Sequence, residues 1–377
     1  MSSRKSLFLE GVSTLTGTII GAGVLGLPYV FYLSGYLPVY FLMLIGFSIC
    51  LSINLMLAEL TLRTHEKHQI PGYIEKFLPK YKKLGKYLVI SSMICGIYGA
   101  ILAYLVAQSN AFYYLFGVNK ILVATIITSL VFLIVLFDIK YVEDLEPVFS
   151  TIVYSLLIGC PLYLFFTHHI NTSILFKFNP KYLMLAFSTT IFSFMGSAAI
   201  PEVREELERD LKMMKKVVLT GMIIPLVLYT IFTLSVCLTN SHVPRVATYL
   251  FGPIGYVLTI VITLCPFLTL SLALKETFEY DCKLPRWLAQ MLVFLPPYLI
   301  LVLFNANVSI FTKALGLVGS LTALLYAVPV LIAHSNSKKT ADRKPEFEIT
   351  IPKPIKVIIV LLLAIATVSN IIYVLFI

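Results

Sequence analysis

Long apolar stretches without a charged residue dominate the sequence. Ten of them contain no Asp, Glu, Lys or Arg: 11–58, 87–119, 121–137, 147–176, 182–201, 217–244, 246–274, 287–312, 314–337 and 357–377. A helix needs roughly 20 apolar residues to cross the hydrocarbon core of a membrane. The first stretch has room for two helices around the turn-forming residues 34–38, and each of the others has room for one. The pattern therefore predicts an all-α polytopic membrane protein with eleven transmembrane helices.

The composition agrees with this prediction. Hydrophobic residues make up 59% of the 377 positions and charged residues only 13%, against roughly 25% charged in an ordinary soluble domain. The chain has too few polar side chains to coat a water-soluble globule, which excludes a cytosolic enzyme, a nucleic-acid-binding module and a disordered chain. It also has no G-x-x-x-x-G-K phosphate loop, so an ATP-driven pump with its own nucleotide domain is not expected.

Lys and Arg are distributed unevenly between the loops. If the N-terminus lies in the cytoplasm and the spans alternate, 24 of the 29 basic residues fall on the inner side. Cytoplasmic loops of membrane proteins carry such an excess. We therefore expect a multi-pass protein of the cell membrane with 63–86, 202–216 and 338–356 in the cytoplasm. Because eleven is odd, the C-terminus is expected outside.

Two apolar segments have a composition that predicts interrupted helices. Residues 17–28 contain four glycines and Pro28, a composition that a continuous helix tolerates poorly. Close packing of the G-x-x-x-G type accounts for the first two of these glycines, whereas the tighter Gly21-Ala22-Gly23 run favours local unwinding, with Pro28 starting the second half-helix. In the sixth span, the small residues 196–199 interrupt an apolar run just before a proline.

The two interrupted segments lie five spans apart, so their helices run in opposite directions. Paired discontinuous helices in inverted repeats are the architecture of many secondary transporters. Unpaired backbone groups persist in a membrane only around a cavity or a ligand. A half-helix N-terminus suits a carboxylate, and half-helix carbonyls suit an ammonium group or a cation. A site with both is complementary to a zwitterion such as an α-amino acid.

At these residues the sequence resembles the amino acid–polyamine–organocation superfamily, closest to its amino acid/auxin permease and hydroxy/aromatic amino acid permease branch. The run Gly21-Ala22-Gly23-Val24-Leu25-Gly26-Leu27-Pro28 and the Leu295-Pro296-Pro297 motif carry most of the resemblance. Shorter matches are Ala58-Glu59-Leu60, Phe194-x-Gly196 through Glu206, 267–274 and 314–319. The resemblance implies a leucine-transporter-like fold of two inverted repeats, 1–170 (spans 1–5) and 171–337 (spans 6–10), followed by a cytoplasmic loop and a peripheral span in 338–377.

The resemblance also implies a substrate site. The substrate carboxylate would sit on the N–H groups around Ala22 and Gly23, and the amino group would meet carbonyls near Ile19, Ile20 and Ser193. The other residues expected around the substrate are Gly21, Val24, the aromatic gate Phe192, the pocket-wall residues Gly196 and Ser197, and Tyr104 as a closing residue.

The resemblance does not determine which ion is coupled to transport. Sodium-coupled relatives place hydroxyls in span 8 where this chain has Cys265 and Pro266, and some proton-coupled relatives have a lysine in span 5, where 147–167 contains none. We expect a neutral α-amino acid substrate, because the spans hold no counter-charge at midplane depth. We also expect coupling to a proton or exchange, contact with membrane lipid, and no cofactor, metal or nucleic acid. A sodium-coupled symporter, a non-transporting amino-acid receptor on the same fold and a channel are the alternatives.

Overall fold

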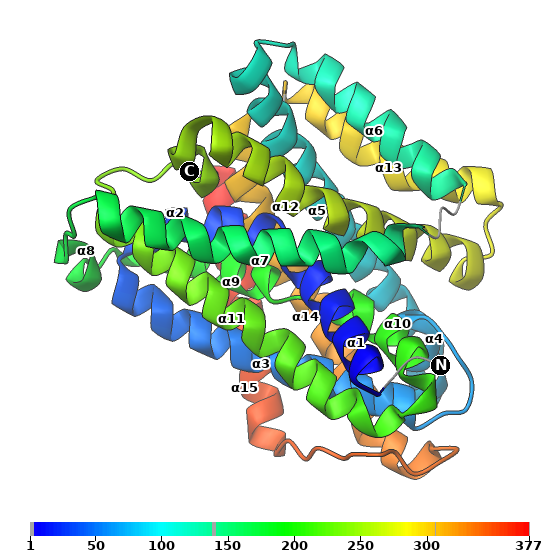
Figure 1. The fold of residues 1–377 in the computed structure, drawn as a ribbon. Coiled ribbons are helices and arrows are strands. Elements are labelled where there is room, and N and C mark those ends of the chain that lie inside the picture. The colour runs from blue at the N-terminus through cyan, green and yellow to red at the C-terminus, as the bar shows by residue number, and fades with distance from the viewer. Residues whose placement is uncertain (1–3, 138–140, 306, 377) are drawn as a thin grey trace.

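The computed structural model describes residues 4–137, 141–305 and 307–376, which fold into helices without a strand among them. The helices pack side by side into one bundle, and the N and C marks lie at opposite ends of it (Figure 1). Their bounds are α1 Arg4–Ile19, α2 Ala22–Ser34, α3 Tyr36–Leu62, α4 Ile70–Phe77, α5 Lys82–Phe116, α6 Lys120–Leu136, α7 Tyr141–Thr167, α8 Ser173–Phe176, α9 Leu183–Ser193, α10 Ile200–Glu206, α11 Met214–Thr239, α12 Gly252–Glu276, α13 Arg286–Leu303, α14 Val308–Thr340 and α15 Lys353–Phe376.

Most of the expected spans are helices of membrane-crossing length. Among the described residues, nine helical stretches are long and apolar enough to cross a membrane, and the bent pair of α1 and α2 adds a tenth. Helix α6, which corresponds to the expected fourth span, has 17 residues. At 1.5 Å per residue it is about 26 Å long, slightly shorter than a hydrocarbon core of about 30 Å. The count of eleven spans therefore stays a prediction that depends on α6.

The first span is broken where the glycine cluster begins. Helix α1 ends at Ile19 and α2 begins at Ala22, with the axes bent by 51° across Ile20 and Gly21. Our expectation that Pro28 starts the second half-helix is wrong. Pro28 lies in the interior of α2, where neighbouring helices of a membrane bundle satisfy the backbone group that a proline leaves unpaired.

Close packing explains two further glycines of this segment, Gly23 and Gly26. A Cβ on Gly26 would come within 2.5 Å of Leu315 Cδ1 on α14, and a Cβ on Gly23 would come within 2.5 Å of Ser193 Oγ. Both glycines lie within the regular turns of α2. Unwinding and close packing therefore both occur in this span, the first at Gly21 and the second at Gly23 and Gly26.

The sixth span is broken as well. Helix α9 ends at Ser193, a single 3-10 turn covers Ser197–Ala199, and α10 runs from Ile200 to Glu206. Helix α9 packs against α14, α3 and α2. The break in this span therefore lies in the middle of the bundle, beside the break in the first span.

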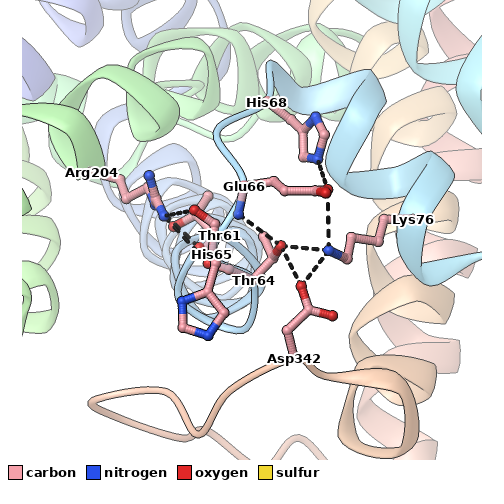
Figure 2. Close-up of polar contacts among 8 residues, drawn as sticks. All are labelled: Thr61, Thr64, His65, Glu66, His68, Lys76, Arg204 and Asp342. Atoms are coloured by element: carbon pink, nitrogen blue, oxygen red, sulfur yellow. Dashed lines mark hydrogen bonds and ion pairs between the residues drawn. The ribbon is translucent and has the colours of Figure 1, made fainter.

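Residues of the three segments expected in the cytoplasm, 63–86, 202–216 and 338–356, lie together (Figure 2), next to the ends of α3 and α14. Lys76 on α4 contacts the carboxylate of Asp342, which lies just beyond α14. Residues far apart in the sequence are thus joined at the same end, as the distribution of Lys and Arg requires. The side of the membrane that this end faces stays a prediction.

A buried arginine completes the contact between these segments. Arg204 on α10 is 5% exposed and donates hydrogen bonds to the carbonyl oxygens of Thr61 and Thr64, each over 3.3 Å. These carbonyls belong to the last turn of α3 and the residues after it. The guanidinium group therefore satisfies backbone acceptors that a helix end leaves unpaired, and it attaches α10 to α3.

Candidate functional site

The N-terminus of α2 supplies backbone donors at the centre of the bundle. The first N–H groups of a helix have no partner within it, and the helix dipole gives them a partial positive charge. In α2 these groups begin at Ala22 and Gly23. The hydroxyl of Tyr104, on α5, lies against this end of the helix. It would be 2.7 Å from a Cβ on Gly21, and it adjoins the backbone of Ala22.

Two helix C-termini supply carbonyls at the same place. Helix α1 ends at Ile19 and α9 ends at Ser193, so the last carbonyls of both helices lack helical partners. The hydroxyl of Tyr229, on α11, donates to both: its oxygen is 2.9 Å from the carbonyl oxygen of Ile19 and 3.3 Å from that of Ser193. Sequence reasoning missed Tyr229, because a tyrosine in an apolar span carries no local signal of its partners.

A cavity of about 80 Å³ lies beside the two breaks. Six of the eleven residues expected at the substrate site line it: Ile19, Ala22, Gly23, Tyr104, Phe192 and Ser197. Helices α5 and α14 supply much of the remaining wall, including Met93, Gly96 and Thr322. The structure thus brings six of the eleven expected residues to one cavity, and their role in binding stays a prediction.

The other five expected residues lie outside the cavity wall. Ser193 is in contact with Gly23, and Gly196 packs on Ile19, whose Cγ1 would be 2.6 Å from a Cβ on Gly196. Gly21 adjoins the Tyr104 hydroxyl, as described above. The remaining two are Ile20, which lines a separate small cavity, and Val24, which is fully buried in α2.

The cavity wall is uncharged but carries hydroxyl groups. Asp, Glu, Lys, Arg and His are absent from the described residues that line it. Ser197 donates to Asn54 Oδ1 over 2.7 Å, which fixes the orientation of its hydroxyl. Tyr326, on α14, lies near Ser197, but its hydroxyl makes no hydrogen bond of normal geometry within the described residues.

A second, smaller cavity also adjoins the first break. It measures about 10 Å³ and is lined by Gly17, Ile20, Cys265 and Pro266, the last two being the positions at which the resemblance leads us to expect the hydroxyls of a sodium site. Helix α7 adds Ser150 and Tyr154 to the wall, and the Tyr154 hydroxyl contacts that of Thr16. Hydroxyls of span 5 therefore line this cavity, although the resemblance leads us to expect them from span 8.

Comparison with known proteins gives both a family and a fold. Residues 4–247 match the model of the tryptophan/tyrosine permease family. No curated protein matches the chain in sequence. A manganese transporter of Eremococcus coleocola, in complex with an aromatic bis-isothiourea substituted compound, is similar with a TM-score of 0.66 at 14% identity, over 98% of this chain and 86% of that one. MhsT in complex with L-phenylalanine is similar with a TM-score of 0.61 at 17% identity, over 99% of this chain and 98% of MhsT. These likenesses confirm the expected leucine-transporter-like fold.

Proposed function

Because this chain belongs to the tryptophan/tyrosine permease family, we propose that it moves a neutral α-amino acid, with tryptophan and tyrosine as the first candidates, across the cell membrane by alternating access. Family membership makes it a membrane transporter and not an enzyme. The two halves 1–170 and 171–337 would act as the inverted repeats, with 338–377 peripheral to them.

The observation that carries the proposal is the meeting of three helix ends beside one cavity. The N-terminus of α2 offers N–H groups at Ala22 and Gly23, while α1 and α9 end in the carbonyls of Ile19 and Ser193. Donors suit a carboxylate and acceptors suit an ammonium group. An α-amino acid carries both groups on one carbon atom, so it matches this arrangement without any charged side chain from the protein.

The remaining wall favours an uncharged side chain on the substrate. The described lining residues carry no charge, and burying an unpaired charge at this depth costs at least roughly 2.5 kcal/mol. Met93 and Met195 line the cavity, and thioethers make favourable contacts with aromatic rings. Tyr326 lines the same wall, and we propose that its hydroxyl pairs with the ring N–H of tryptophan or the hydroxyl of tyrosine.

A divalent metal is a poorer match to the cavity. One solved structure of similar fold is a manganese transporter, and manganese prefers carboxylate, carbonyl and water ligands. Among the described residues no group of three or more His, Cys, Asp or Glu side chains is placed to hold a metal ion. The cavity described here would have to bind the ion without a carboxylate, which favours the amino acid as the transported molecule.

Coupling to a proton, or exchange of one substrate for another, is the mode of transport that we propose. The small cavity beside Gly17 and Ile20 offers a soft sulfur at Cys265 and no donor atom at Pro266, whereas sodium prefers oxygen ligands, as hard cations do. One observation favours the alternative of sodium symport: Ser150 and Tyr154 add hydroxyl oxygens to this cavity.

The test is uptake by purified protein reconstituted in proteoliposomes. We expect uptake of labelled L-tryptophan or L-tyrosine above that of empty liposomes, inhibition by other neutral aromatic amino acids, and no inhibition by Mn²⁺, lysine or glutamate. Specific binding of the amino acid without flux would indicate a receptor, and ion currents independent of substrate would indicate a channel. Failure to bind or transport any neutral amino acid would overturn the proposal.

A further inference from the structure

Tyr229 occupies a position that no local sequence pattern indicates. It lies on α11 with its side chain fully buried, and its hydroxyl oxygen is within hydrogen-bonding distance of two carbonyl oxygens, those of Ile19 and Ser193. These residues are 210 and 36 positions away from it in the sequence. One hydroxyl thus joins the last residue of α1 to the last residue of α9.

The two carbonyls are an unusual pair to bring together. Each ends a helix, and the C-terminus of a helix carries roughly half a negative charge. Two such ends repel each other unless a donor lies between them. The proton of the Tyr229 hydroxyl offsets this repulsion and keeps both carbonyl oxygens directed at one point. A carbonyl oxygen has two lone pairs, so each can still accept a bond from a second donor.

Tyr229 acts from behind these carbonyls. Ile19 is among the residues that line the cavity of about 80 Å³, whereas Tyr229 is not. Its ring packs on that of Phe194, the residue after Ser193, with the ring centres 5.3 Å apart. The direction of the hydroxyl is therefore set by the packing of the ring, and a bound molecule need not touch it.

We propose that Tyr229 is a positioning residue for the ammonium group of the substrate. Its hydroxyl holds the carbonyl oxygens of Ile19 and Ser193 in fixed positions, so that both can accept hydrogen bonds from the ammonium group. The N–H groups of α2 bind the carboxylate without the help of Tyr229. The inference rests on the proposed function, because it requires a substrate that carries an ammonium group.

The test separates the two ends of the substrate with analogues that each lack one of them. Inhibition of labelled L-tryptophan uptake would be measured for L-tryptophan, for tryptamine, which lacks the carboxylate, and for indole-3-propionate, which lacks the ammonium group. In Tyr229→Phe we expect the inhibition constants of L-tryptophan and tryptamine to rise about tenfold, the equivalent of one hydrogen bond. That of indole-3-propionate should stay as in the wild type.

A matched control is Tyr249→Phe. The Tyr249 hydroxyl also donates to a backbone carbonyl, that of Ala107 over 2.6 Å, but Tyr249 does not line the cavity. This variant should leave all three inhibition constants unchanged. If an analogue does not inhibit the wild type, the kinetics of L-tryptophan decide instead: positioning predicts a higher KM with kcat retained in Tyr229→Phe.

Three outcomes in Tyr229→Phe would overturn the inference: an equal rise in the inhibition constants of all three compounds, a fall in kcat with an unchanged KM, or no change in any of these constants. The first two would assign Tyr229 a general structural role. The wild type measured in the same assay keeps this failure distinct from that of the proposed function. A wild-type protein without L-tryptophan uptake would overturn the proposed function, whereas normal wild-type uptake with an insensitive Tyr229→Phe variant would overturn only the role of Tyr229.

Discussion

Gly23 on α2 and Ser193 at the end of α9 touch so closely that no side chain fits between them. A Cβ on Gly23 would lie 2.6 Å from the Cβ of Ser193 and 2.7 Å from its Cα, which is closer than non-bonded carbon atoms approach. The Ser193 backbone cannot move away without moving the end of α9. The absence of a side chain at position 23 thus allows the N-terminus of α2 to meet the C-terminus of α9.

We therefore predict that Gly23→Ala separates the two helix ends. Overpacking of this kind typically costs about 1–3 kcal/mol, so the melting temperature in detergent should fall and uptake in proteoliposomes should be lost. The control is Gly159→Ala on α7, where a Cβ would meet no described atom within 4 Å. Wild-type stability and uptake in Gly23→Ala would show that the contact is not required.

A second prediction concerns Gly21 and Tyr104. A Cβ on Gly21 would lie 2.7 Å from the Tyr104 hydroxyl oxygen, whereas the next nearest atom, Cγ of Pro266, is 3.2 Å away. Gly21→Ala should therefore destabilise the protein, and Tyr104→Phe should relieve much of that loss by removing the oxygen. Residues in contact usually show a coupling free energy of at least about 0.5 kcal/mol.

The measurement is a double-mutant cycle on the free energy of unfolding, with Gly21→Ala, Tyr104→Phe and the double variant. Additive effects would mean that the hydroxyl and position 21 do not interact. Uptake of L-tryptophan should remain low in the double variant even where stability recovers, because Tyr104 also lines the cavity and adjoins the backbone of Ala22.

Much of the fold follows from local patterns that the sequence displays. Charge-free apolar runs determine the spans, because a helix in lipid must satisfy its own backbone groups and present apolar side chains. The break at Gly21 was predictable from the density of glycine. The position of Pro28 was not, since a proline can begin a half-helix or lie within one, and only the neighbouring helices decide between the two.

The part of the site that the sequence could not predict depends on contacts between distant spans. Tyr229 and Tyr326 are tyrosines in apolar helices, and in such helices tyrosine is commonly found at the membrane interface. Their positions at the breaks arise from the way α11 and α14 pack against α1 and α9. The place of Asn54 beside the site was likewise not predictable, because it depends on the hydrogen bond that Asn54 accepts from Ser197, 143 residues away.

The orientation of the protein gives a third prediction. Lys80, Lys212 and Lys339 are exposed and belong to the three segments expected in the cytoplasm. Single cysteines at these positions in a cysteine-free background should resist a membrane-impermeant thiol reagent in intact cells and react after permeabilisation. Lys181→Cys, exposed in an expected outer loop, should react in intact cells. Labelling of position 80, 212 or 339 from outside would reverse the orientation.

A fourth prediction concerns the loop that follows α14. Lys76 and Thr64 donate hydrogen bonds to the carboxylate of Asp342 and hold its pKa below the usual range. A carboxyl group with a lowered pKa stabilises the folded state above its ordinary pKa of about 3.9, and this contribution is lost as the pH falls below that value. Attachment of the loop should therefore be independent of pH between about 5 and 8 and weaken below about pH 4.

Hydrogen exchange of the Asp342 amide reports this attachment, because the amide donates to the carbonyl oxygen of Arg63 over 2.9 Å. After correction for intrinsic exchange rates, its protection should be constant from pH 8 to 5 and decline below about pH 4 in the wild type. In Asp342→Asn it should be low at every pH, while Glu75→Gln on the neighbouring α4 should resemble the wild type. Protection in Asp342→Asn equal to that of the wild type would show that the carboxylate does not hold the loop.

The last prediction concerns the coupling ion and the small cavity beside Gly17 and Ile20. Its volume of about 10 Å³ is at the lower limit of the space that a single water molecule needs. Cys265 and Pro266 supply no oxygen from their side chains. We therefore expect uptake of L-tryptophan to be unchanged when choline replaces sodium at fixed pH. Uptake should rise with an inward proton gradient or with unlabelled substrate inside the liposomes.

Ser150 provides the variant that makes this test decisive, because it is a wall residue whose hydroxyl could serve a sodium ion. In a sodium-independent transporter, Ser150→Ala should have the same uptake as the wild type in both sodium and choline. A sodium site would instead give a large loss of wild-type uptake in choline, and Ser150→Ala would reproduce that loss in the presence of sodium. The hydroxyls of α7 would then supply the oxygen ligands that the side chains of Cys265 and Pro266 lack. The proposal of proton coupling or exchange would be abandoned.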